Sequence, residues 1–293
     1  MLNRWNTKVE DLNLILSKLN EIAKRVIKRE KKRGRKPRHS MVKYTVLIVL
    51  KEASKKTLRG AEVEWSKKVC GVRVDHSVIA YWENKKEILS AVKKIISIAG
   101  TMLDKYLSSL FSFVDSTKFS NWNINEVEFT LCNRIANGTV YPVGISFETN
   151  SVRAPVEEAV PEGNGKLYAD AWYDNEKAIK VLFEKGYIPI ICPNKNRWRG
   201  HYRKKARKLY RLRENRLGYR QRGRGESLFG SLTNKYGDRF TAKNGIAMKI
   251  RIASRVITYQ IRLLIRLTEK MGLILRHALK MVKYIYFVFI VIK

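Results

Sequence analysis

Three carboxylates stand where the side chains of an α/β protein commonly do chemistry. Asp115 follows the apolar run 111–114, Asp170 follows the short apolar run 167–169, and Glu226 opens a helical segment. Strand ends and helix starts are where such folds present functional groups. Carboxylates from separate elements can hold two divalent ions about 3.5–4 Å apart for phosphoryl transfer. Because Mg²⁺ prefers oxygen ligands, the pattern predicts a site for two Mg²⁺ or Mn²⁺ ions.

Each acid also has a purely structural interpretation. Asp115 can cap a turn through its side chain, and Glu226 in a first helical turn can complement the helix dipole. Asp170 competes with Asp174, since either can cap the helix that follows. The order of the three acids, beside a large positive charge, favours the catalytic interpretation.

The surrounding elements indicate a mixed α/β fold. The pattern changes from helical to extended near residue 110, and Asn137-Gly138 is a strong hairpin signal. A short strand, a helix and another strand then form a unit typical of a parallel pair. Segment 151–166, with two prolines and two glycines, is expected to be a loop. The predicted strands are 111–114, 127–133, 139–148, 167–169 and 187–192, and the predicted helices are 175–185, 226–235 and 246–267.

The N-terminal part reads as helical. Apolar residues recur at helical spacing in 9–27, 42–50 and 58–69, and a further helix begins near Asp75. Short helices joined by a tight turn are typical of a helix-turn-helix, in which Ser77, Tyr81 and Lys85 would share one DNA-facing surface. The alternative is a plain helical bundle with no DNA contact. A longer helix is predicted over 86–110.

Two stretches are strongly basic. Ten of the fifteen residues in 24–38 are Lys or Arg, and this arm carries the candidate DNA contacts Arg35, Lys36 and Arg38. It can equally be a solvated linker. Segment 195–224 carries 14 Lys or Arg with interleaved aromatics, including Trp198. Cations for phosphates and rings for bases suit strained or single-stranded DNA, although a solvated basic helix is the alternative.

The overall charge points to a polyanionic partner. The chain has 293 residues with 60 Lys and Arg against 26 Asp and Glu, a net charge of +34. Nucleic acid is the favoured partner, and an RNA-binding protein of ribosomal type or a membrane-surface protein is the alternative.

The cysteines and the chain ends suggest an intracellular protein. Three scattered cysteines and four scattered histidines suggest neither disulfides nor zinc. No signal peptide is recognised, and the apolar run 284–292 is shorter than the roughly 20 residues of a membrane span. We therefore expect a cytoplasmic protein that does not enter a membrane.

The chain resembles the DDE transposases of prokaryotic insertion sequences. The resemblance rests on Val114-Asp115-Ser116-Thr117, on the run 168–174 around Asp170, and on Tyr219, Arg222 and Glu226, which match a tyrosine–arginine–glutamate signature of one branch. That signature continues with a lysine seven residues after the glutamate. The position here is Thr233, and the nearest lysine is Lys235.

The resemblance implies an RNase H-like catalytic core. In the predicted organisation, residues 1–105 form a helical DNA-binding region and 106–268 the catalytic domain, with a basic insertion at 194–224 and an apolar tail at 269–293. It further implies that Asp115, Asp170 and Glu226 hold the ions while Tyr219 and Arg222 grip the transposon end. Water would then nick double-stranded DNA at the element's terminal repeats, and the freed 3′-hydroxyl would attack target DNA. A homodimer associated with the nucleoid is also implied.

Three alternatives remain open at this stage. The first is a DNA- or RNA-binding protein without catalysis, which leaves the placed acids unexplained. The second is a metal-dependent nuclease of the same fold that cuts without joining. The third is a decayed, inactive transposase.

Overall fold

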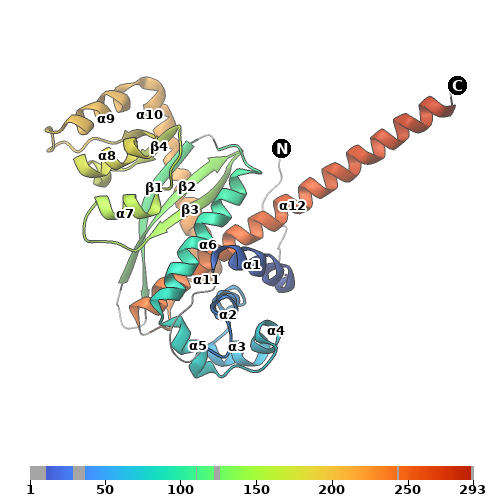
Figure 1. Cartoon of the computed structure of the whole chain (residues 1–293). Helices are drawn as coiled ribbons and strands as arrows, with labels where there is room; N and C mark the ends of the chain where they lie inside the picture. Colours follow the sequence, from blue (N-terminus) through green and yellow to red (C-terminus); the bar gives the residue numbers. More distant parts are fainter. Residues whose placement is uncertain (1–10, 29–36, 110, 122–125, 243, 292–293) are drawn as a thin grey trace.

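A six-stranded mixed sheet lies at the centre of the molecule (Figure 1). The computed structural model describes residues 11–28, 37–109, 111–121, 126–242 and 244–291, with side chains to residue 271. The strands run in the order β3-β2-β1-β4-β5, and a sixth strand pairs with β1. They are β1 (Phe111–Asn121), β2 (Glu126–Ala136), β3 (Thr139–Ser146), β4 (Lys166–Ala169), β5 (Ile188–Ile191) and β6 (Arg239–Phe240).

The strand directions follow from the connections. β1, β2 and β3 are antiparallel neighbours, and the predicted hairpin joins β2 to β3 through Asn137 and Gly138, which both have positive φ. β4 is parallel to β1, and β5 is parallel to β4 across the intervening helix α8 (Glu176–Glu184). The predicted mixed α/β fold is confirmed, and the sheet is consistent with an RNase H-like core preceded by helices.

Helix α6 (Lys86–Asp104) and helix α12 (Gly245–Val291) pack against β3 and against each other. Gly100 permits the close approach of α6, since a Cβ there would lie 2.7 Å from the Cα of Val143. The buried Gln260 of α12 donates from its side-chain nitrogen to the carbonyls of Ile96 and Pro142, at 2.8 and 2.9 Å. This amide joins both helices to the sheet edge.

Helix α7 (Arg153–Ala159) corrects the prediction of a loop over 151–166. Pro155 stands in the first turn of α7, where a missing backbone N–H removes no helical hydrogen bond. Val156 and Ala159 are buried, and a Cβ on Gly144 of β3 would meet the Ala159 carbonyl. Burial of this apolar side therefore stabilises a helix that the prolines and glycines around it concealed.

Four of the five N-terminal helices begin at a side-chain cap, and α4 does not. Asp11, Ser40, Thr57 and Asp75 accept hydrogen bonds from backbone N–H groups of the first turns. The expected single helix over 58–69 is divided at the buried Trp65. The helices are α1 (Leu12–Val26), α2 (Met41–Ala53), α3 (Leu58–Glu64), α4 (Ser66–Cys70) and α5 (His76–Glu83).

Helix α12 is continuous through the segment where a separate tail was predicted. Its first half packs on α6, α2 and α1, and its second half extends away from the other elements (Figure 1). Within the described residues, no helix is both long enough and apolar enough to cross a membrane.

Candidate active site

Asp115 and Asp170 lie side by side because of the register between β1 and β4. These strands are parallel, and Val114 is paired with Ala169. Asp115 and Asp170 are the next residues on the two chains, so they lie side by side where β4 ends next to the middle of β1. The prediction that the first strand ends at Asp115 is wrong, because β1 continues to Asn121, where it pairs with β6. Each is held locally: Asp115 Oδ1 accepts from the Ser116 backbone N–H, and Asp170 Oδ1 accepts from that of Trp172, both at 3.0 Å.

Glu226 is brought to these acids by helix α11 (Arg224–Tyr236). Its neighbour Gly225 rests on the ring of Phe113, and a Cβ there would lie 2.2 Å from a ring carbon. Phe113 and Asp115 project from the same face of β1, because strand side chains alternate. The absence of a side chain at Gly225 therefore sets the first turn of α11 close to Asp115.

The charges show that the three acids are near one another. Burial raises the pKa of Asp115 above its ordinary value, and the negative charges of Asp170 and Glu226 raise that pKa further. Arg222 and the Ser116 N–H act in the opposite direction, and an Arg222 nitrogen lies 3.4 Å from Asp115 Oδ2. This concentration of negative charge is what a divalent cation would neutralise.

Tyr219, Arg222 and Glu226 converge without sharing one regular helix. Tyr219 ends α10 (Arg213–Tyr219), Arg222 belongs to the 3-10 turn η2 (Arg220–Gly223), and Glu226 opens α11. The Arg222 guanidinium lies 5.8 Å from the Tyr219 ring centroid. Mainly through burial, the pKa of Tyr219 rises to about 12, so this hydroxyl stays protonated at neutral pH.

A hydroxyl network behind the acids was not foreseen from the sequence. The buried Tyr173 bonds through its OH to Ser116 Oγ at 2.7 Å, and Ser116 Oγ bonds to Thr130 Oγ1 at 2.8 Å. Tyr173 lies in η1 (Ala171–Tyr173), directly after Asp170, and Ser116 directly follows Asp115. The network therefore ties the two acid-bearing segments together. Polar residues at inward positions of a strand were its only sequence signal.

The competition between Asp170 and Asp174 has a geometric answer. Asp174 is buried, pairs with the Arg203 Nε at 2.8 Å and accepts from the Asn194 N–H at 2.7 Å. It fastens helix α9 (His201–Arg211) and the segment before it to the sheet. Asp170 is partly exposed beside Asp115, so it is the acid available to a ligand.

The donor set fits divalent metal ions. Three carboxylates supply hard oxygen ligands. Burial is the main cause of the raised pKa of Asp115, and the smaller contributions from the charges of Asp170 and Glu226 are ones that a cation would offset. Their oxygens do not all lie within 4.8 Å of one another in this structure. Two ions about 3.5–4 Å apart need ligands spread more widely than a single ion does.

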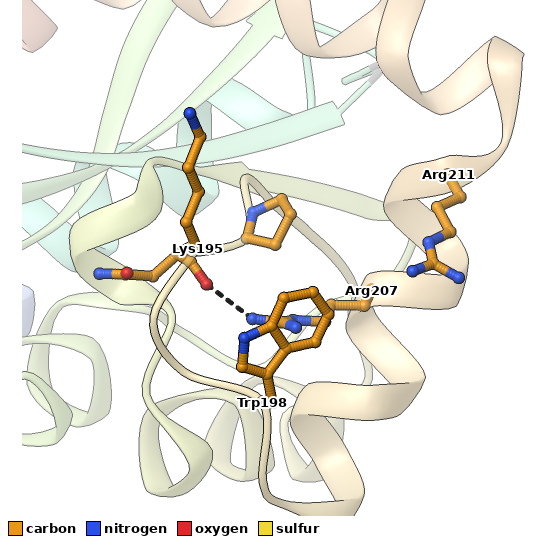
Figure 2. A pocket seen from close by; sticks show the side chains of 6 residues that line it. Lys195, Trp198, Arg207 and Arg211 are labelled. Atoms are coloured by element: carbon orange, nitrogen blue, oxygen red, sulfur yellow. Dashed lines mark hydrogen bonds between the residues drawn. The ribbon is translucent and has the colours of Figure 1, made fainter.

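Trp198 presents an exposed ring in the basic segment (Figure 2). It is 65% exposed and lies 4.5 Å from the guanidinium of Arg207. Arg207 is itself held by the carbonyls of Asn194 and Arg197. Trp198 and Arg207 line a hollow of about 150 Å³. The other residues around this hollow are Pro193, Asn194, Lys195 and Arg211.

Most of the other candidate DNA contacts are far from the acids along the chain, whereas Lys235 shares helix α11 with Glu226. Tyr81 of α5 is exposed, with the Lys85 ammonium 4.0 Å from its ring centroid, and Ser77 is exposed in the first turn. Arg38 is exposed, and Lys235 is exposed in the last turn of α11. Arg35 and Lys36 lie outside the described residues.

A second cluster joins Glu62, Asp75 and His76, whose possible ligand atoms all lie within 4.8 Å of one another. Glu62 is already engaged by Arg73 and by both the backbone and ring nitrogens of His76. These bonds hold the pKa of Glu62 below its ordinary value. The cluster anchors the start of α5 against α3.

Replacing Gly225 by alanine is expected to lower stability by about 1–3 kcal/mol, because the added methyl group must displace the fully buried Phe113. The same shift would move Glu226 away from Asp115 and reduce any activity of the site. Thermal melts and activity assays measure both effects. Gly223→Ala is the control, since a Cβ there meets nothing within 4 Å. Equal effects of the two substitutions would contradict this packing.

Residues 149–261 match the protein family described as Transposase DDE domain. The match includes Asp170 and Glu226, and Asp115 precedes it on β1. Such a domain suggests a catalytic transposase that acts on DNA, and DDE transposases generally use divalent metals. Searches of curated proteins and of solved structures found no significant match.

Proposed function

We propose that this protein is a DNA transposase that cuts and joins DNA at Asp115, Asp170 and Glu226. The observation that carries the proposal is the meeting of these acids from β1, β4 and α11, where their charges raise the pKa of Asp115. The matched transposase DDE domain supports it. The sheet supplies two of the acids from neighbouring parallel strands, Asp115 from within β1 and Asp170 from the carboxyl end of β4.

Each acid has a distinct part in the proposed site. Asp115 is proposed to bind both ions. Asp170 on the neighbouring strand and Glu226 on α11 are proposed to complete the ligand set. When bound, two Mg²⁺ or Mn²⁺ ions would activate the attacking oxygen and stabilise the leaving one. Arg222, now paired with Asp115, is positioned to turn to a DNA phosphate once cations take its place.

The basic segment of α9–α11 is proposed to hold the DNA end. Trp198 offers an open ring over Arg207, and bases stack on such rings without regard to sequence. Tyr219 contacts Arg222 beside the acids. Helix α5, with Ser77 and Tyr81 on its surface, is proposed to bind duplex DNA together with Lys85, which follows α5, and with Arg35, Lys36, Arg38 and Lys235.

Trp198→Ala is expected to weaken binding to DNA with unpaired ends by about 1–3 kcal/mol, through the loss of base stacking. Binding to a fully paired duplex should change little, because its bases are already stacked. Fluorescence anisotropy with the two DNAs measures the difference. Tyr106→Ala removes another exposed ring, just after α6 and outside the basic segment, and serves as the control. An equal loss for both DNAs would contradict the stacking role.

Nicking of a labelled duplex tests the proposed function. The wild-type protein is expected to cut with Mg²⁺ or Mn²⁺ and not with EDTA. Cutting without any joined product would favour a nuclease of the same fold. Tight binding without cutting under either metal would favour a DNA-binding protein or a decayed enzyme and would overturn the proposal.

A further inference from the structure

A cleft of about 680 Å³ opens between the N-terminal helices and the region where β6 leads into α12. This volume lies within the range of pockets that bind small ligands. Four exposed cations stand around it: Lys55 and Lys56 in the connection between α2 and α3, Arg59 in α3, and Arg239 in β6. None of the three acids lines it, although Tyr236 at the end of α11, the helix that carries Glu226, does.

Two of the exposed cations, Lys55 and Arg59, form no ion pair with a carboxylate within the described residues. Lys55 lies 5.9 Å from the ring centroid of Tyr236, whereas Lys56 pairs with Glu64 at 2.9 Å. An anion entering the cleft would therefore meet Lys55 and Arg59, whose charges are not already neutralised.

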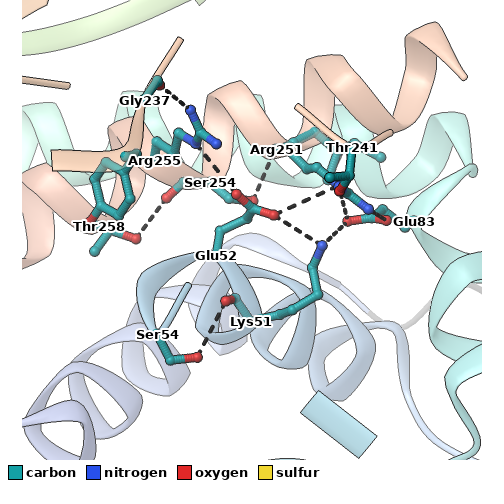
Figure 3. A network of polar contacts seen from close by, with 12 residues as sticks. Lys51, Glu52, Ser54, Glu83, Gly237, Thr241, Arg251, Ser254, Arg255 and Thr258 are labelled. Atoms are coloured by element: carbon teal, nitrogen blue, oxygen red, sulfur yellow. Dashed lines mark hydrogen bonds and ion pairs between the residues drawn. The ribbon is translucent and has the colours of Figure 1, made fainter. Parts of the chain in front are cut away.

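The buried wall behind them carries a surplus of positive charge (Figure 3). Lys51 and Arg251 converge on Glu83, at 2.6 and 2.7 Å, and Arg255 reaches Glu52 at 3.4 Å. Three cations thus share two carboxylates. Burial lowers the pKa of Arg255 even though Glu52 opposes the change, so this buried charge is incompletely compensated.

The distance between the cleft and the acids corresponds to a short length of DNA. β6 pairs with the end of β1, where Arg239 is opposite Ser120. Ser120 is five residues beyond Asp115, which is about 17 Å along a strand at roughly 3.3 Å per residue. Successive base pairs of DNA rise about 3.4 Å along the helix axis, so about five base pairs of a duplex that runs along β1 span the same distance.

We propose that this cleft binds backbone phosphates of the duplex DNA whose cut position lies at Asp115, about five base pairs away. The inference rests on the proposed function in taking DNA as the substrate, and it assigns a second contact to that substrate. The cleft holds one or two phosphates of the strand, and the N-terminal helices and the sheet would both contact the same DNA.

The test compares two double variants with equal loss of charge. Lys55→Gln with Arg59→Gln removes exposed cations of the cleft, and Lys94→Gln with Lys105→Gln removes exposed cations of α6 outside it. Binding of a labelled duplex is measured at several salt concentrations in EDTA. For each phosphate contact that is lost, the slope of log affinity against log salt concentration should become less steep by about 0.9. The loss of two contacts should therefore change the slope of the cleft variant by nearly 2. The α6 variant should keep the wild-type slope.

Equal slopes for the two double variants would overturn the inference. The single variant Arg59→Lys, with Lys55 unchanged, keeps the charge of the cleft and should show most of the wild-type slope. This comparison distinguishes the loss of a phosphate contact from a change in folding. Because binding is measured without metal, its outcome is independent of cleavage. If the wild-type protein never cuts DNA but the cleft variant alone shows the reduced slope, the transposase proposal would be wrong and the inferred phosphate-binding site would still be supported.

Discussion

Asp115→Asn is expected to reduce strand cleavage by at least about 10³-fold, which corresponds to a loss of about 4 kcal/mol of transition-state stabilisation. Asp115 lies beside Asp170 on the neighbouring strand and pairs with Arg222, so its carboxylate is a proposed metal ligand. An amide keeps the shape of the side chain but loses the charge and one oxygen ligand. The measurement is the initial rate of nicking with Mg²⁺.

The fold should survive this substitution. A carboxyl whose pKa is raised in the folded state lowers stability at pH values above that pKa. Removing its charge should therefore leave the melting temperature at pH 7.5 equal to or above that of the wild type. DNA binding in EDTA should also persist. A variant that cuts DNA at the wild-type rate, or that loses cleavage only because it unfolds, would contradict the assignment.

Glu83→Ala is expected to lower the free energy of unfolding by about 3–5 kcal/mol, the usual effect of removing one partner from a buried ion pair. Glu83 ends α5 and accepts from Lys51 of α2 and from Arg251 of α12. Without Glu83, the buried cations Lys51 and Arg251 would share Glu52 as their remaining carboxylate partner. Urea titration at pH 7 measures the change.

The pH dependence of this contribution has a definite sign. Burial acts to raise the pKa of Glu83, but Lys51 and Arg251 outweigh it and hold that pKa below its ordinary value. The contribution is therefore present at pH 7 and is lost as pH falls through the lowered pKa. Glu64→Ala is the control, because its exposed pair with Lys56 is worth at most about 1 kcal/mol. Similar losses in the two variants would contradict a buried network.

The parts of the fold that the sequence predicted well are those with a local cause. Asn137-Gly138 supplies the turn that joins β2 to β3, and the apolar runs before Asp115 and Asp170 form the parallel strands that bring these acids together. The glycines at 223 and 225 correctly indicated an irregular helix start before Glu226.

The parts that escaped prediction depend on contacts between distant segments. β6 is too short to show a periodicity, and α7 is stabilised by burial against β3. Lys51 and Glu83 have the composition of surface residues, and only their partners from α12 explain their burial. The choice between Asp170 and Asp174 likewise depended on Arg203, which lies far along the chain from both acids.

The most direct test of the account is the formation of joined DNA from a labelled fragment that carries the element's own terminal repeats. We predict that the wild-type protein, given Mg²⁺ or Mn²⁺ and target DNA, releases a 3′-hydroxyl and produces joined molecules. EDTA or Asp115→Asn should abolish both products. Joining that persists in Asp115→Asn, or the absence of any metal-dependent cutting or joining by a folded wild-type protein, would contradict the account.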